Sequence, residues 1–329
     1  MLATVILRRG RKNNLKPKKV VVIGGGTGLS VLLRGLKTFS VDITAIVTVA
    51  DDGGSSGRLR QELNIPPPGD VRNVLIALAE VEPLVEELFQ HRFTNGGGLT
   101  GHSLGNLLLA GMTSITGDFS RGITEVSKVL NVRGKVFPAA NRSVVLHAEM
   151  EDGTIVSGES KIPLEQKRIK RVFLTPENIV PLQESLRAIR EADLIVLGPG
   201  SLYTSVLPNL LVPGISEAVI QAKANKIYIC NVMTQSGETD DYTAAEHLEA
   251  LFAHCGPELI DDILVHGSPV SKEVQEHYAK EQASPVVVDL DQLHTMGVNV
   301  INDHFVVEKD QMLRHDAQKV SKALLRTVE

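Results

Sequence analysis

The sequence predicts an α/β fold, a doubly wound and mainly parallel β-sheet with helices on both faces and a small antiparallel insertion. Two observations lead to this prediction. Short apolar runs rich in β-branched residues alternate along the chain with stretches of helical periodicity, which is the pattern of parallel sheets. Glycine-rich or polar loops follow several of these runs. Because the carboxyl ends of parallel strands share one edge of the sheet, we expect a ligand site there.

The first predicted strand and helix enclose a glycine-rich turn. The run Val20–Ile23 leads into the turn Gly24, Gly25, Gly26, Thr27, Gly28, and a helical pattern follows from Leu29 to Leu36. Glycines let a ligand approach the backbone, and the N-terminus of a helix favours a phosphate. The spacing is G-x-G-x-G, with Leu29 where a dinucleotide motif has its last glycine. The turn therefore predicts a phosphate or nucleotide site more strongly than an NAD site, and a plain strand-to-helix turn is the alternative.

Two adjacent acids follow the second predicted strand, Val41–Val49. Asp51 and Asp52 stand there among glycines and serines. An acid at this position binds ribose hydroxyls in dinucleotide sites, whereas two or three carboxylates can hold Mg²⁺ against a phosphate. Asp70 is expected to cap the next helix, and its carboxylate could converge on the same ligand site as the two adjacent acids. Because successive side chains diverge, we expect only one of the adjacent pair to point inward.

The stretch Gly101–Gly105 has the G-x-S-x-G spacing of a nucleophile elbow, which would make Ser103 the nucleophile of a hydrolase. That motif requires a strand directly before the turn, and residues 93–100 do not have a strand pattern, so the sequence disfavours this hypothesis. His102 remains a candidate acid, base or phosphate contact, because an unperturbed histidine titrates near neutrality.

The chain changes character at about residues 118–190. Val144–Met150 and Thr154–Ser157 flank a tight turn and predict a hairpin, and Val172–Leu174 predicts a further strand. We therefore expect a basic, flexible leader at residues 1–18 and a single nucleotide-binding domain at residues 19–329. An antiparallel subdomain is expected to be inserted in that domain at about 118–190.

The alternation of strands and helices resumes after this insertion, with strands predicted at 193–197, 226–230, 263–266 and 285–289. Gly198, Gly200 and Ser201 follow the first of these strands, and Asn231 follows the second. These loops offer hydroxyls, amides and backbone N–H groups but few cations, which suits sugar hydroxyls and a diphosphate. No lysine follows a glycine stretch as it does in a P-loop, which argues against an ATP-hydrolysing P-loop.

Composition narrows the class of protein. The 329 residues include 34 Lys or Arg and 39 Asp or Glu, and the formal net charge is −5. Residues 1–19 contain seven of the basic residues and no acid, so the rest of the chain carries −12 and is a poor partner for nucleic acid. No apolar run approaches the roughly 18 residues that span a bilayer, so we expect no membrane insertion. Two cysteines, Cys230 and Cys255, predict no disulfide framework, and we expect a cytoplasmic protein.

Together, six stretches resemble the bacterial gluconeogenesis factor (YvcK-like) group, in the superfamily of the CofD-like 2-phospho-L-lactate transferases. The resemblance covers roughly residues 20–300 and excludes the basic leader. The stretches are Gly24–Gly28, Thr48–Gly57, Pro66–Asn73, Gly101–Asn106, Gly198–Ser205 and Asn231–Gln235.

This resemblance implies a Rossmann-like core with a nucleotide or nucleotide-sugar pocket at the carboxyl edge of the sheet. In the transferase relatives, an Asp pair after the second strand and an Asp in the following loop lie near a metal ion. Those positions match Asp51, Asp52 and Asp70 here. The resemblance also implies that Thr27 and the Gly198–Ser201 loop contact the nucleotide. The candidate nucleotide contacts are Gly24, Gly25, Gly26, Thr27, Gly28, Asp51, Asn73, Gly198, Gly200, Ser201, Asn231 and Tyr278.

The resemblance further implies a cytoplasmic regulator that binds a UDP-sugar such as UDP-N-acetylglucosamine and links growth on gluconeogenic carbon sources to cell-wall synthesis and cell shape. We expect a homo-oligomer with protein partners in cell-wall synthesis. One alternative is an Mg²⁺-dependent transferase that moves a phosphorylated three-carbon acid from a nucleotide diphosphate donor, such as a GDP-linked one. Its catalytic candidates are Asp51, Asp52, Asp70 and His102. A second alternative is an NAD-binding protein. The aromatic content of 4% and the lack of tryptophan argue against a flavin-like acceptor.

Overall fold

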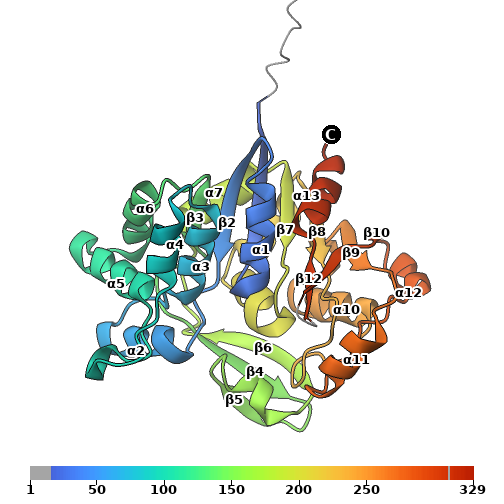
Figure 1. Ribbon diagram of the computed structural model, residues 1–329. Coiled ribbons are helices and arrows are strands. Elements are labelled where there is room, and N and C mark those ends of the chain that lie inside the picture. The colour runs from blue at the N-terminus through green and yellow to red at the C-terminus, as the bar shows by residue number, and fades with distance from the viewer. Residues whose placement is uncertain (1–15, 310–311) are drawn as a thin grey trace, which may run out of the picture.

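A seven-stranded, all-parallel sheet forms the centre of the protein (Figure 1). The computed structural model describes residues 16–309 and 312–329, so most of the predicted basic leader, residues 1–15, lies outside the described residues. The strands are β1 (Lys18–Gly24), β2 (Val41–Val47), β3 (Lys135–Pro138), β7 (Leu194–Leu197), β8 (Asn225–Ile229), β9 (Asp262–His266) and β10 (Asn299–Asp303). Their spatial order is β10-β9-β8-β7-β1-β2-β3, which is doubly wound as predicted.

The central strand explains why the sheet is parallel and buried. Val20–Ile23 of β1 are at most 2% exposed, and all four residues of β7 are fully buried. A strand that is covered on both faces carries apolar side chains at successive positions. This explains the continuous apolar runs in the sequence. β1 pairs with β2 on one side and with β7 on the other.

The chain winds outward from β1 in both directions, so the connections leave opposite faces of the sheet. The helices are α1 (Gly26–Leu36), α2 (Gly54–Leu63), α3 (Gly69–Leu78), α4 (Pro83–Gln90), α5 (Leu104–Thr116), α6 (Phe119–Val129), α7 (Gln183–Arg190), α8 (Leu207–Leu210), α9 (Ile215–Gln221), α10 (Ala244–Cys255), α11 (Lys272–Ala279), α12 (Leu290–Thr295) and α13 (Ala317–Arg326). Helix α1 packs against α3 and α13 on one face of the sheet (Figure 1). Helix α7 contacts α9 on the other face.

Two small antiparallel sheets complete the fold. One has the order β5-β4-β6, from β4 (Val145–Met150), β5 (Ile155–Ser157) and β6 (Ile169–Thr175), and lies below the carboxyl edge of the main sheet in Figure 1. The other is a hairpin of β11 (Val306–Lys309) and β12 (Met312–His315). The antiparallel strands span residues 145–175, a shorter range than the insertion predicted at about 118–190. Helix α6 packs on β3, and β3 pairs with β2, so this part of the predicted range belongs to the main sheet.

Two local predictions are wrong. Residues 285–289 form no strand, since Pro285 and Val287 make isolated bridges to Met233 and Thr243. The last strand of the main sheet is instead β10, an exposed edge strand whose few apolar residues gave little signal. Asp70 does not cap α3, because the helix already begins at Gly69 and Asp70 lies in its first turn. Within the described residues, no helix is long and apolar enough to cross a membrane.

Candidate functional site

A cavity of about 790 Å³ opens where the winding direction of the sheet changes, beside the carboxyl ends of β1, β7 and β8. Open α/β sheets bind ligands in this position, and the volume is that of a typical small-molecule site. The first turn of α1 and the loops after β7 and β8 line the cavity, together with residues from the antiparallel insertion, α11 and β12. The predicted contacts among the lining residues are Gly26, Thr27, Gly28, Gly200, Ser201, Asn231 and Tyr278.

The N-terminus of α1 faces this cavity. Gly26 begins the helix in the left-handed region, at φ +70°, which glycine adopts without strain. The first turn of α1 contains no acidic residue of its own, although Asp70 accepts the N–H of Gly26, and the exposed Thr27 lines the cavity with Gly28. Because the first N–H groups of a helix have no partner inside it and carry the positive end of its dipole, this turn suits a phosphate.

Close packing explains why glycines occur in the turn after β1 and in the turn after β7. A Cβ on Gly25 would lie 2.6 Å from a carboxylate oxygen of Asp70, and one on Gly28 would lie 3.1 Å from the carbonyl oxygen of Pro199. A Cβ on Gly200 would lie 3.2 Å from the carbonyl oxygen of Gly25. The turn after β1 and the turn after β7 therefore contact each other at Gly28 and Gly200, where there is little room for a side chain.

Neutral hydrogen-bonding groups join the loops after β7 and β8. The Asn231 side-chain amide donates to Gln235 Oε1 at 2.9 Å, and the Gln235 amide donates to Ser201 Oγ at 2.8 Å. All three side chains line the cavity. The expected neutral lining of amides and hydroxyls is thus present as one connected network.

Glu238 is a buried acid in the cavity wall that the sequence did not indicate. Its side chain is 6% exposed and accepts hydrogen bonds from the Thr204 hydroxyl at 3.1 Å and from the backbone N–H groups of Tyr203 and Thr204. These N–H groups open a π-helical turn, Leu202–Val206, so the carboxylate occupies its N-terminus. Burial raises the pKa of Glu238 to about 7, although its hydrogen bonds act in the opposite direction.

Glu159 and Asp70 are two further acids in this region, and the pKa of each is raised. Glu159 comes from the antiparallel insertion and lines the same cavity. Burial, and then the neighbouring charges of Asp51, Asp70 and Glu238, raise its pKa to about 8. Burial and the charge of Asp51 raise the pKa of Asp70 to about 6, although Asp70 accepts the Gly26 N–H.

The three predicted metal ligands turn toward different partners. Asp51 Oδ1 accepts the N–H of Gly53 at 2.8 Å, and Asp52 Oδ1 accepts the N–H of Ser160 at 2.9 Å. Asp70 faces Gly26. Across residues 16–309 and 312–329, no group of three His, Cys, Asp or Glu side chains is placed to hold a metal ion. Asp51 and Asp70 remain electrostatically coupled neighbours, so this geometry offers a pair of carboxylates and not a trio.

His102 belongs to a structural network away from the cavity lining. The ring is 3% exposed, and its Nδ1 lies 2.9 Å from the Ser55 hydroxyl while Nε2 contacts the Arg58 guanidinium. Asn106 donates to the same Ser55 hydroxyl at 3.0 Å. Burial and the charge of Arg58 lower the pKa of His102. The network joins α2 to α5.

Asn73 and Ser103, which the sequence also singled out, form hydrogen bonds with residues close to them in the chain. Asn73 Oδ1 accepts a hydrogen bond from the Arg72 guanidinium at 2.7 Å and does not line the cavity. Ser103 is the N-cap of α5 and accepts the N–H of Asn106. No strand leads into Ser103, so it does not form a nucleophile elbow.

Part of the cavity lining is apolar and comes from α11 and the C-terminal hairpin. Tyr278 is 9% exposed, and its hydroxyl accepts the N–H of Leu313 at 3.1 Å. Tyr278, Met233 and Met312 belong to a separate apolar cluster beside the sheet. Arg314 follows on β12 and lines the cavity. Arg314 was not predicted as a site residue. The sequence around it gives no sign that the fold brings it to the same cavity as the distant glycine-rich turn after β1.

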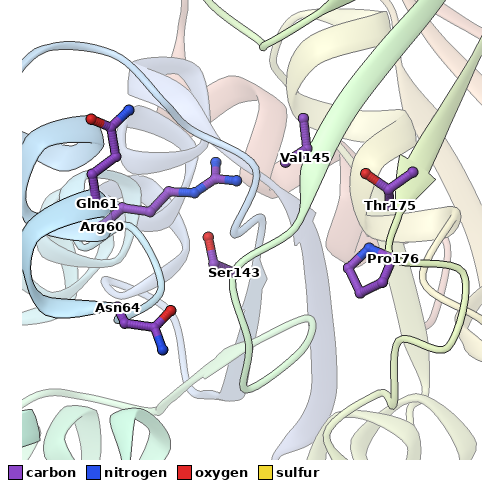
Figure 2. Close-up of a pocket in the computed structure, with 7 residues that line it drawn as sticks. All are labelled: Arg60, Gln61, Asn64, Ser143, Val145, Thr175 and Pro176. Carbon is purple, nitrogen blue, oxygen red and sulfur yellow. The ribbon is translucent and has the colours of Figure 1, made fainter.

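A second pocket, of about 490 Å³, lies between α2 and the antiparallel sheet (Figure 2). Arg60 extends from α2 toward Ser143 and Val145, with Thr175 and Pro176 on the opposite side. This pocket is close to the Asp51–Asp52 loop, because both acids act on the Arg60 charge.

Comparison with known proteins gives consistent matches along the chain. The family model described as 2-phospho-L-lactate transferase CofD matches residues 20–306. A gluconeogenesis factor of Halalkalibacterium halodurans is 72% identical over 311 residues, which is 94% of this chain and 97% of that protein. One of Bacillus subtilis is 66% identical over 310 residues, covering 94% of this chain and 98% of that protein.

The fold is also found in solved structures. A crystal structure of a Bacillus halodurans protein superposes with a TM-score of 0.93 at 72% identity, covering 94% of this chain and 100% of that one. Extensive sequence identity and a nearly complete structural match therefore agree. This chain belongs to the gluconeogenesis factor family, which is CofD-like.

Proposed function

We propose that this chain is a cytoplasmic regulator that binds a nucleotide sugar, with UDP-N-acetylglucosamine as the favoured ligand, and that it links gluconeogenic carbon metabolism to cell-wall synthesis and cell shape. The observation that carries the ligand proposal is the cavity at the switch point of the sheet. Its lining combines the N-terminus of α1, one arginine (Arg314) and the apolar cluster around Tyr278.

The lining of the cavity supports one orientation of the ligand. The apolar cluster around Tyr278 suits a nucleobase, because the aromatic ring of the base could stack on the residues of the cluster. The diphosphate would lie between the first turn of α1 and Arg314, where N–H groups and a guanidinium favour negative charge. The sugar would then extend toward the neutral network of Ser201, Asn231 and Gln235.

The cellular part of the proposal has separate support. The relatives named gluconeogenesis factor support a role in carbon metabolism. The link to cell-wall synthesis and to protein partners there rests on the resemblance of the sequence motifs. The homo-oligomeric state is part of the same proposal. A regulator of this kind acts by presenting a different surface when its ligand is bound.

A transferase is the second candidate, and one observation favours it. Asp51 and Asp70 are coupled carboxylates beside the first turn of α1, and the matching family model is that of a transferase. An NAD-binding protein has weaker support. Neither Asp51 nor Asp52 lines the cavity, so the acid that would hold a dinucleotide ribose is turned elsewhere.

A thermal-shift screen separates these candidates. The panel is UDP-N-acetylglucosamine, UDP-glucose, GDP, NAD and NADP, each with and without Mg²⁺. A ligand at 100 times its dissociation constant stabilises by about 2.7 kcal/mol, which raises the Tm of a chain of this size by a few degrees. We expect a shift with UDP-sugars that does not depend on Mg²⁺. A shift with GDP that requires Mg²⁺ would favour the transferase, and a shift with NAD alone would refute both.

A matched pair of arginine variants tests the placement of the diphosphate. Arg314→Ala removes the arginine that lines the cavity, whereas Arg326→Ala removes an exposed arginine near the end of α13. Because a charge-assisted hydrogen bond contributes about 1.5–3 kcal/mol, Arg314→Ala should weaken UDP-N-acetylglucosamine binding by roughly 10- to 100-fold in calorimetry. Equal affinity in the two variants would contradict the placement.

A further inference from the structure

Three glutamates and one arginine line the cavity. Arg314 and Glu281 line it together with the apolar cluster around Tyr278, and Glu159 and Glu238 line it from the antiparallel insertion and the loop after β8. A bound ligand of nucleotide-sugar size has an anionic diphosphate, and the sugar beyond it can be neutral or charged. The acids therefore bear on which sugar the cavity accepts, an inference that rests on the proposed function.

Glu238 is fixed in place and cannot turn away from a ligand. Its carboxylate accepts the Thr204 hydroxyl and the N–H groups of Tyr203 and Thr204, and its side chain is 6% exposed. These donors hold the carboxylate at the cavity wall. The carboxylate has further lone pairs, which can accept hydrogen bonds from the O–H or N–H groups of a ligand in the cavity.

Glu159 faces a group of like charges. It reaches the cavity from the loop after β5, and the charges that act on it are those of Asp51, Asp70, Glu238 and Asp52. Lys161 follows two residues later, and its side chain packs near Gly158. Once these acids are ionised, a further anion beside them would be repelled by several carboxylates in a partly desolvated site, where like charges interact more strongly than in water.

We propose that Glu159 and Glu238 make the cavity select nucleoside diphosphates that carry a neutral sugar and reject those that carry a uronic acid. Neutral sugar hydroxyls donate hydrogen bonds to the two carboxylates. A uronate presents a carboxylate to them. This is discrimination by a repulsive element as well as an attractive one.

A matched pair of ligands tests the proposal. UDP-glucose and UDP-glucuronic acid differ only at C6, where a hydroxymethyl group is replaced by a carboxylate. Calorimetric affinities at pH 8.5 are measured for both ligands and for UDP, with the wild type, Glu159→Gln, Glu238→Gln and the control Glu87→Gln. Glu87 is an exposed residue of α4 that does not line the cavity.

We expect the wild type and Glu87→Gln to bind UDP-glucose at least about tenfold more tightly than UDP-glucuronic acid. That ratio should fall several-fold in Glu159→Gln and in Glu238→Gln, while the affinity for UDP stays within about twofold or rises. Glu159→Gln keeps the proposal testable if Glu238→Gln folds poorly, because Glu159 is a partly exposed loop residue.

Two outcomes overturn the inference. In one, the wild type binds both sugars equally. In the other, the preference survives unchanged in both glutamine variants. Failure of the proposed function looks different, since the wild type would then bind neither UDP nor UDP-glucose.

Discussion

Glu238 makes the stability of the folded protein depend on pH in a defined direction. The ordinary pKa of a glutamate is 4.5, and burial in the folded protein raises that of Glu238 to about 7. Because the folded state holds the proton more tightly than the unfolded state, the contribution of Glu238 to stability is fully present below pH 4.5. It is lost as the pH rises through 7. The difference between the two pKa values corresponds to about 3 kcal/mol.

Glu238→Gln removes this dependence, because an amide does not ionise. Glutamine keeps a carbonyl oxygen that can accept from Thr204, so the variant and the wild type should have similar stability near pH 5. At pH 8.5 the variant should be more stable by up to about 3 kcal/mol, or a few degrees in Tm. Urea or thermal unfolding at several pH values between 5 and 9 measures the difference.

Glu87→Gln changes an exposed glutamate and should leave the pH profile of the wild type intact. The pKa of Glu159 is raised mainly by burial and by Asp51 and Asp70, and less by Glu238, so most of its contribution is common to the wild type and the variant at one pH. If the difference in unfolding free energy between Glu238→Gln and the wild type is the same at pH 5 and pH 8.5, the reasoning about Glu238 is wrong.

Three further changes test the packing of the fold by urea unfolding. Gly35→Ala should destabilise by about 1–3 kcal/mol, because its Cβ would lie 2.4 Å from the carbonyl oxygen of Ala317 and α13 would have to move away from α1. Gly111→Ala, at an exposed position inside α5 with open space around it, should instead stabilise by about 0.5–1 kcal/mol, and a loss there would contradict the comparison. Tyr203→Phe should cost about 1–2 kcal/mol, since it leaves the buried Tyr242 hydroxyl without its partner at 2.9 Å; no loss would mean that this hydrogen bond contributes nothing.

The sequence predicted the architecture well because parallel strands leave a strong local signal. Val20–Ile23 and Leu194–Leu197 are buried on both faces, so their apolar character is visible without any knowledge of their neighbours. The edge strand β10 was missed for the opposite reason. Asn299, Asn302 and Asp303 sit on an exposed edge, where the main sheet does not require apolar residues.

The candidate site was predictable where it is built from local turns. Thr27 and Ser201 follow buried strands, and the rule that ligands bind at the carboxyl ends of parallel strands brings them to one cavity. Glu238, Glu159 and Arg314 come from a loop, an insertion and a C-terminal hairpin, and only the folded chain brings them together. Their chemical type alone does not distinguish them from the many surface charges of the sequence.

The contact between the two glycine turns has a consequence for the kinetics of recognition. The turn after β1 and the turn after β7 are held together by the protein's own atoms, through Gly28 against Pro199 and Gly200 against Gly25. In the proposed placement, a diphosphate would lie on turns that already contact each other, so binding would not have to bring them together, which lowers the entropic cost of association. Encounter should then be a single step whose observed rate rises linearly with ligand concentration. Differences in affinity among nucleotides should lie mainly in how long each one stays.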